Sequence, residues 1–347
     1  MVNNSNEIIG TAGNATGLDN SALYFKSFYP SFQSILSWAM VGVGFAGILS
    51  NVLTIIVYVK LGFKETINIS YLALALSDLG CVLTAMFSGV LNTSALEHVF
   101  ESYRIKMDLV SVIRLLATWP HIVFSKTTAI LTAWISVQRC LCVVFPTKVR
   151  HIVSLTVTRV VITSIFVAVC CPVAFVYVER RLALRFDPLD NYTTLNVYGG
   201  KTDRGIDLVS LRLMYGFVYP ILSWVIVTVC TTFLILRLRT AARWRHLNSG
   251  NQGRVTARET RVTKTIVTVA TIFILCSVLQ PLHVLANVMF SEYSRTGSLR
   301  FIDMAITEIT VLLGQFNSSV NIIVFTVLGC RFRSVLFKMI SAWFCVR

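Results

Sequence analysis

Charged residues are scarce in this sequence. They make up 14% of its 347 residues, against about 25% in typical soluble domains, while 55% of the residues are apolar. The mean hydropathy is +0.71. A soluble domain is therefore excluded, and repeated runs of about 20 apolar residues indicate helices that cross a membrane. The predicted spans are 35–59, 66–91, 109–144, 157–178, 209–236, 265–290 and 301–328.

The chain also lacks the marks of extra domains, of a transporter repeat and of a signal peptide. Its loops are short, no internal repeat is evident, and residues 1–25 have neither a basic start nor an apolar core. We predict an all-α membrane protein, a seven-transmembrane helix bundle with an amphipathic C-terminal helix on the inner leaflet. Its parts are an extracellular disordered tail at 1–33, the bundle at 34–329, and a cytoplasmic amphipathic helix with a short tail at 330–347.

Acidic residues are too few to balance the basic ones, and the net charge is +15. If the N-terminus is extracellular, 18 of the 31 Lys and Arg residues but only two of the 16 acidic residues fall on the inner side. This asymmetry is the positive-inside pattern, so the basic surface faces membrane lipids and no nucleic acid partner is expected. We predict a multi-pass plasma membrane protein with a cytoplasmic C-terminus. Glycosylation sequons on the predicted outer side start at Asn3, Asn14, Asn92 and Asn191.

Cysteine is missing from every predicted outer segment. All nine cysteines lie in spans or on the inner side, where thiols stay reduced, and none has zinc-ligand spacing. After the seventh span, apolar residues such as Phe332, Leu336 and Met339 recur at helical spacing between basic ones, which predicts an interfacial helix. Cys345 near its end is a candidate palmitoylation site, and an unmodified cysteine is the equal alternative.

A few polar residues lie inside the apolar spans. Asp78 falls near the middle of the second span, and Asn51 lies in the first. A charge at mid-bilayer costs roughly 2.5–3.5 kcal/mol, so Asp78 predicts a functional polar site with partners on other helices. The alternative is that such residues only join helices, which is equally open for Asn51. Pro220 and Pro281 interrupt the fifth and sixth spans and predict kinks.

Together these features resemble the rhodopsin-like (class A) G-protein-coupled receptors. The resemblance covers about 35–344 and rests on motifs that occur in the family's order: "SNVLTIIVY", "LALALSDL", "SVQRCLCVVFP", "YGFVYP", "LQPLH", "NSSVNIIVF" and "CRFRSVLF". It implies that an extracellular ligand activates a heterotrimeric G protein, which Arg139 would contact once the inner ends of the third and sixth helices part. It also implies a water-filled core around Asp78, Asn51 and Asn321. No cofactor is expected beyond a sodium ion, which Asp78, Asn321, Thr128 and Asn317 would hold.

The chain departs from that family beside the coupling arginine. Gln138 stands where the family has an acid, and Cys140 where it has a tyrosine. An acid would pair with Arg139 and favour the resting state, whereas Gln138 offers no charge. We therefore expect a smaller bias toward rest and higher basal activity.

Three further positions differ. The seventh-helix Asn-Pro-x-x-Tyr motif has lost its proline, and its tyrosine is Phe325. The sixth-helix tryptophan before Pro281 is Leu279, and the third-helix cysteine of the family's outer disulfide is Arg114. The covalent tie over the ligand pocket is therefore expected to be absent.

Two familiar ligand classes lack their residues here. Amine receptors carry an aspartate at the position of His121, and a histidine does not pair with an ammonium in the same way. Opsins carry a Schiff-base lysine in the seventh helix, but 301–328 contains no lysine and the aligned residue is Gln315. Monoamines and retinal are therefore disfavoured.

The expected cavity is cationic instead, which predicts a ligand with a carboxylate or another anionic group. Lys126 or Arg212 would hold that group. The alternatives are that Lys126 pairs with Glu308 or extends to water, and that the two histidines only pack with one hydrogen bond each. The predicted ligand contacts are His121, Lys126, Arg212, Gln280, His283 and Glu308.

The segment "TAWISVQRCLCVVFPTKVRHIVSLTVT" is similar to gastropod-type chemosensory receptors and to invertebrate peptide receptors. A chemosensory receptor is the first hypothesis and a neuropeptide receptor the second. A membrane transporter is the alternative from another class, and G-protein nucleotide exchange against ligand flux would separate the two. An enzyme is not expected, because HExxH, a Ser-His or paired-aspartate site and a phosphate loop are all missing.

Overall fold

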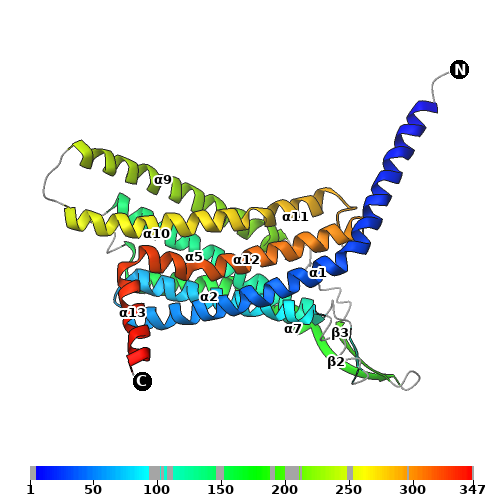
Figure 1. The fold of residues 1–347 in the computed structure, drawn as a ribbon, viewed down its shortest axis with the longest axis horizontal. Coiled ribbons are helices and arrows are strands. Elements are labelled where there is room, and N and C mark those ends of the chain that lie inside the picture. Colours follow the sequence, from blue (N-terminus) through cyan, green and yellow to red (C-terminus); the bar gives the residue numbers. More distant parts are fainter. Residues whose placement is uncertain are drawn as a thin grey trace.

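Seven long apolar helices form one bundle in the computed structural model of the chain (Figure 1). The structure describes residues 5–93, 102, 105–107, 112–145, 152–187, 192–199, 211, 213–247, 253–294 and 297–345, with only the backbone for 5–26. The bundle helices are α1 (Ser5–Leu61), α2 (Thr66–Leu91), α5 (Trp119–Val144), α7 (Leu155–Glu179), α9 (Tyr219–Leu247), α10 (Gly253–Ser277), α11 (Leu279–Met289) and α12 (Arg300–Leu328). α10 and α11 together form the sixth span.

The seven-helix prediction is confirmed. The candidate spans are Ser27–Leu61, Thr66–Leu91, Leu115–Val144, Leu155–Val178, Met214–Arg237, Val267–Met289 and Arg300–Leu328, each within a few residues of the predicted run except at some outer ends. Within a bilayer the backbone has no water to hydrogen-bond with. A helix satisfies its backbone N–H and C=O groups within the segment itself, so apolar spans of this length are expected to be helical.

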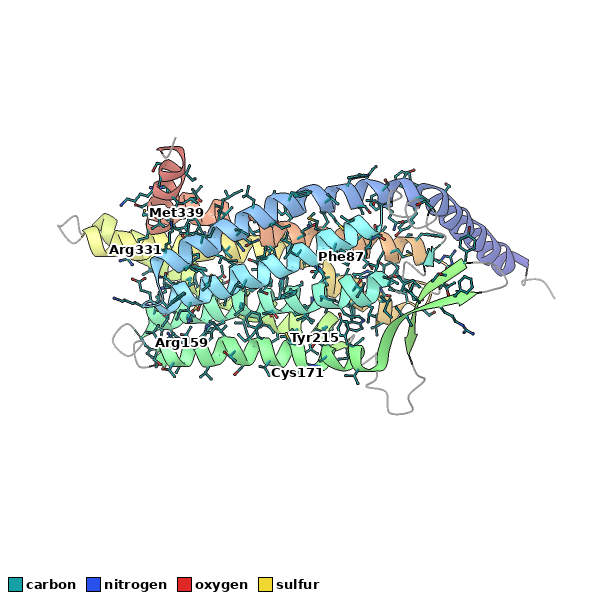
Figure 2. All side chains as sticks on the ribbon, turned by 90° about the horizontal axis from the view of Figure 1, so that it is seen from below. Phe87, Arg159, Cys171, Tyr215, Arg331 and Met339 are labelled. Carbon is teal, nitrogen blue, oxygen red and sulfur yellow. The ribbon has the colours of Figure 1, made fainter. Side chains whose placement is uncertain are left out.

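The amphipathic helix after the seventh span is also present, as α13 (Cys330–Cys345). It leaves the bundle axis at a steep angle, at the end that also carries the connection between α9 and α10 (Figure 1). Phe332, Leu336 and Met339 are buried against the bundle, while Arg331 is exposed and pairs with Glu65 at 2.5 Å. Arg331 and Arg159 lie toward the same end of the molecule (Figure 2). We call this the coupling end.

The N-terminal tail differs from the prediction, because α1 is helical from Ser5 onward and not irregular up to residue 33. Extending an existing helix avoids the cost of nucleating a new one, so a polar tail can continue a membrane span. Pro30 lies inside this helix, whose outer part points away from the bundle (Figure 1).

A small sheet at the opposite end was not predicted by the all-α assignment. It consists of β1 (Ile105–Met107), β2 (Arg180–Asp187) and β3 (Tyr192–Gly199) in the order β1-β3-β2. The last two strands form an antiparallel hairpin, and β1 pairs with β3 in parallel. Alternating apolar and polar residues in "RRLALRFD" suit a two-sided strand, but its pairing depends on the fold of two separate loops.

Three irregular turns accompany prolines in the bundle. π-helical turns at Arg114–Thr118 (η1) and Met214–Val218 (η2) precede Pro120 and Pro220, and α10 ends at Ser277, four residues before Pro281. A proline cannot donate to the carbonyl four residues back, so the backbone widens or breaks there. The predicted kinks at Pro220 and Pro281 thus coincide with such turns.

Candidate functional site

A buried polar core joins three helices in the middle of the bundle. Asp78 on α2 is fully buried, and its Oδ1 accepts a hydrogen bond from Thr128 Oγ1 of α5 at 2.9 Å. Its Oδ2 accepts one from Asn321 Nδ2 of α12 at 2.8 Å. Ser77 Oγ accepts a second, 3.0 Å bond from Thr128. The structure therefore brings together three of the four residues predicted to hold sodium.

Asn51 reaches the same core indirectly. Its Nδ2 donates to the carbonyl oxygen of Ser318 at 2.9 Å, and Ser50 Oγ donates to that of Ser319 at 2.9 Å, so α1 is fastened to α12. Asn317 is buried nearby and lines the outer cavity described next. Asn51 thus links α1 to α12 in this structure, as the alternative interpretation of its role describes.

An outer cavity of about 150 Å3 opens above this core. It lies between α5, α9, α10, α11 and α12, and its described lining includes one lysine and neither aspartate nor glutamate. Lys126 is the lysine, at 2% exposure, and its Nζ donates to Gln280 Oε1 at 2.5 Å. This contact joins α5 to α11. Four of the six predicted ligand contacts line the cavity: His121, Lys126, Gln280 and His283.

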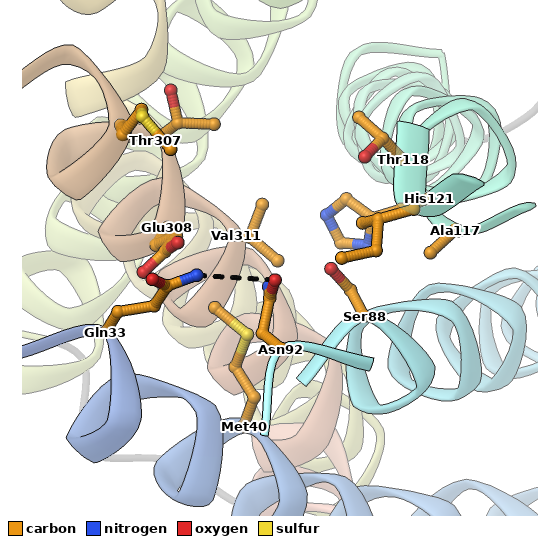
Figure 3. A pocket seen from close by; sticks show the side chains of 12 residues that line it. Gln33, Met40, Ser88, Asn92, Ala117, Thr118, His121, Thr307, Glu308 and Val311 are labelled. Atoms are coloured by element: carbon orange, nitrogen blue, oxygen red, sulfur yellow. Dashed lines mark hydrogen bonds between the residues drawn. The ribbon is translucent and has the colours of Figure 1, made fainter. Parts of the chain in front are cut away.

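A second cavity of about 110 Å3 adjoins the first and shares four lining residues with it, Thr118, His121, Thr307 and Val311 (Figure 3). It is bounded by α1, α2, α5 and α12, and Glu308 lines it. Glu308 Oε1 accepts a hydrogen bond from Tyr29 OH at 2.9 Å. The proposed internal pair of Lys126 with Glu308 is therefore not what the structure shows, since Lys126 is bonded to Gln280.

The two histidines have separate environments. His121 is buried, and its Nδ1 lies 3.2 Å from the carbonyl oxygen of Cys81 on α2. His283 on α11 contacts both α12 and the loop that connects the two helices. Its Nδ1 lies 2.9 Å from Tyr293 OH of that loop, and its Nε2 lies 3.4 Å from Asp303 Oδ1 of α12. Thr307 Oγ1 is 3.2 Å from the same Nε2. Both histidines thus make several polar contacts and line a cavity.

Tyr293, in the loop between α11 and α12, places a phenol against His283. Burial raises the pKa of Tyr293 above its ordinary value, and the nearby Asp303 charge adds to the rise. The phenol therefore remains protonated at neutral pH and can donate to Nδ1 of His283.

At the coupling end, the side chain of Gln138 hydrogen-bonds to two other helices. Gln138 is buried at 3% exposure, accepts a hydrogen bond from Ser70 Oγ of α2 at 2.9 Å, and donates to Thr158 Oγ1 of α7 at 3.3 Å. Arg139 is half-buried, and its Nε has no hydrogen-bond partner among the described residues. Its positive charge acts instead on the hydroxyls of Tyr58 and Tyr71.

Sequence reasoning missed an aromatic cluster next to Arg139. Phe325 packs on Tyr71 with ring centroids 4.7 Å apart, and on Tyr58 at 5.7 Å and Phe332 at 5.6 Å. The cluster links α1, α2, α12 and α13. Phe325 therefore contributes ring packing at the coupling end, although it has no hydroxyl. A buried tyrosine near the inner end of each of the first two spans was the available signal.

Several predicted sites lie outside the described residues or have no described side chain. These are Arg212, Asn3, Asn14, Asn191 and Cys345. Asn92 ends α2 and lines the second cavity, where its Oδ1 accepts a hydrogen bond from Gln33 Nε2 at 3.4 Å (Figure 3). Its glycosylation stays a prediction. Among the cysteines whose side chains are described, none forms a disulfide, Cys140 included.

Seven spans around a buried acid, with a cavity at one end and a basic helix at the other, define a multi-pass membrane protein of the seven-helix receptor type. The family model described as serpentine type 7TM GPCR chemoreceptor Srw matches residues 39–343, and the chain belongs to this family. No curated protein matches the chain. The family is one of receptors, whose partners are a G protein and an extracellular ligand. It supports the chemosensory prediction and favours neither the neuropeptide receptor nor the transporter.

Proposed function

We propose that this chain is a plasma membrane chemosensory receptor for a small extracellular molecule with an anionic group. The observation that carries the proposal is Lys126, buried in a cavity whose described lining holds no acid. An ammonium buried without an opposite charge is unfavourable, and a ligand carboxylate would supply that charge. A cavity of about 150 Å3 suits a small molecule better than a peptide.

The same contact explains how binding would reach the coupling end. Lys126 Nζ is held by Gln280 of α11, next to the break between α10 and α11. A ligand carboxylate competes with Gln280 for Lys126 and loosens α11 from α5. The sixth span then pivots at Pro281, its inner end leaves α5, and Arg139 meets the G protein as in rhodopsin-like receptors. The ligand acts by binding this open state better than the closed one.

Nucleotide exchange on a G protein tests the proposal. Membranes containing the receptor are screened with small carboxylic acids, each paired with its neutral amide. Acids should activate and their amides should not. Lys126→Met should lower the potency of an active acid about 10- to 100-fold, because a charge-assisted hydrogen bond is lost. Lys126→Arg should retain part of the response.

Ser125 lies beside Lys126 and lines the same cavity, so Ser125→Ala is the matched control and should keep the potency of the acid. Each variant is compared at equal amounts of receptor in the membrane. Unchanged potency in Lys126→Met, or equal activation by an acid and its amide, would contradict the proposal.

We also propose that the N-terminus is extracellular and the C-terminus cytoplasmic. The support is the charge distribution, since α13 and the basic connection between α9 and α10 share one end of the bundle (Figure 1). Treatment of intact cells with a glycosidase is expected to shift the electrophoretic mobility of the protein. A C-terminal tag that antibodies reach without permeabilising the cells would overturn this orientation.

A further inference from the structure

Two cysteines from different helices meet at the coupling end. Cys140 on α5 donates from Sγ to the carbonyl oxygen of Cys230 on α9, at 3.3 Å. The two thiols are also close enough to act on each other. Both are partly exposed and both are free thiols. Cys140 directly follows Arg139 in the chain, so the contact lies beside the predicted coupling arginine.

Other cysteines of the bundle helices have different surroundings. Cys81 faces His121, and Cys170 and Cys171 are exposed neighbours on α7. Cys142 is partly exposed two residues after Cys140, which places it on nearly the opposite side of α5. The pairing is therefore a property of one position on each helix and not of a cysteine-rich surface.

We propose that Cys140 and Cys230 form a reversible disulfide when a peroxide oxidises them, tying α5 to α9 beside Arg139. One thiolate attacks the peroxide oxygen, which gives a sulfenic acid and releases water after protonation. The second sulfur then displaces water from the sulfenic acid. In sum, two thiols and one hydrogen peroxide give one disulfide and two waters, and a dithiol reductant reverses the product.

The tie has a direct consequence for coupling. It fixes the separation of α5 and α9 at the end of the bundle where the G protein would bind, and where the pivoting sixth span must leave α5. The oxidised receptor should therefore activate a G protein less than the reduced one. This half rests on the proposed function, whereas disulfide formation itself does not.

Differential alkylation of the full-length protein in membranes tests the chemistry. After exposure to hydrogen peroxide, the sample is quenched in acid, denatured and alkylated, and each cysteine is quantified by mass spectrometry. Cys140 and Cys230 should lose alkylation together and regain it after dithiothreitol. In Cys140→Ser, Cys230 should stay alkylatable, whereas the Cys142→Ser control should behave as wild type. Protection of Cys230 in Cys140→Ser would overturn the pairing, as would oxidation of Cys170 and Cys171 while the pair stays reduced.

Ligand-stimulated nucleotide exchange tests the consequence on the same membranes. Exchange should fall several-fold in peroxide-treated wild type, recover with dithiothreitol, and be insensitive to peroxide in Cys230→Ser. Full crosslinking without a change in exchange would overturn the effect on coupling. If neither redox form supports exchange, the receptor function fails while the alkylation result still decides the disulfide.

Discussion

One side chain, Gln138, links three helices at the coupling end. It is bonded to Ser70 of α2 and to Thr158 of α7, while it is itself on α5. The neighbouring Arg139 has tyrosine hydroxyls and not carboxylates around its charge in the described residues. With glutamine at position 138, Arg139 has no ionic partner among the described residues, and the neutral amide can both donate and accept.

Gln138→Glu should lower ligand-free signalling. A carboxylate at this position can still accept from Ser70, and can accept from Thr158, to which the amide donates. Its charge beside Arg139 favours the closed state by attraction in a poorly solvated site. Basal nucleotide exchange, measured without ligand at equal receptor amounts, is the readout. Gln138→Leu removes the amide without adding charge and should not lower basal exchange. Equal basal exchange in wild type and Gln138→Glu would rule out this account of the resting state.

Asp78 has the oxygen chemistry for a sodium ion. Thr128 and Asn321 hold its two carboxylate oxygens in place on α2, and the outer cavity lies next to them through Thr128 and Asn317. A hard cation bound there would offset the cost of an ionised acid within the bundle.

Sodium should therefore stabilise the purified receptor. Its thermal unfolding midpoint should rise with sodium concentration and rise less in choline at the same ionic strength, because only an ion bound to the folded state shifts the equilibrium. Asp78→Asn keeps the size and loses the charge, so its midpoint should respond equally to both salts. A sodium-specific rise that persists in Asp78→Asn would place the ion elsewhere.

At the scale of elements, polar contacts around His283 join the outer end of the sixth span to α12 and to the loop before it. Tyr293 approaches His283 from the loop, while Asp303 and Thr307 approach it from α12. Asn287, one turn along α11, donates to Asp303 at 2.8 Å. α11 and α12 are thus joined just outside the pivot at Pro281, and this joint holds an imidazole 3.4 Å from a carboxylate.

Acid should strengthen this joint and raise the ligand concentration needed for half-maximal activation. Protonated His283 would gain an ionic attraction to Asp303, whose Oδ1 lies 3.4 Å from Nε2, and this attraction resists movement of α11. The ligand used must keep its own charge over the pH range tested. His283→Asn and Asp303→Asn should each flatten the pH dependence. A wild-type curve that persists in both variants would assign it to another group, such as His121 or Lys126 in the cavity.

The small sheet also acts between elements. β1 lies in the segment between α2 and α5, and β3 in the segment between α7 and α9, and their parallel pairing joins these two outer segments. The resembled family joins the same regions by a disulfide. Hydrogen bonds of the strand pair thus make a non-covalent connection where the sequence has Arg114 in place of a cysteine.

For the whole molecule, the sequence predicts features that depend on neighbouring residues better than contacts between residues far apart in the chain. The spans and α13 follow from local apolar runs. The contact of Asp78 with Asn321 follows from motifs that occur in the same order as in the rhodopsin-like receptors. The bonds of Tyr29 with Glu308 and of Gln138 with Thr158, and the meeting of Cys140 with Cys230, follow from no local pattern. They depend on the rotation of each helix, which small residues and packing determine. The sheet depends likewise on two loops that pair only after the bundle forms.

The packing of α1 against its neighbours gives the sharpest test at this scale. A side-chain carbon at Gly47 would collide with Ser319 of α12 and come within 2.9 Å of Val82 of α2, at the level where Ser50 and Asn51 are bonded to α12. Gly42 lies on the same helix with open space around it. The two glycines therefore differ in packing while sharing sequence context and helix type.

Gly47→Ala should lower the thermal unfolding midpoint of the purified receptor, whereas Gly42→Ala should keep or raise it. Both substitutions gain up to about 1 kcal/mol of helix propensity, but at Gly47 overpacking costs about 1–3 kcal/mol and separates α1 from α12. The Gly42→Ala variant removes propensity from the comparison, so the difference between the two midpoints isolates the collision. Equal midpoints would mean that α1 does not approach α12 as closely as in this structure. The same separation should weaken the bonds from Ser50 and Asn51, so the loss in Gly47→Ala should shrink when Asn51→Ala is already present, as expected for residues that share one contact.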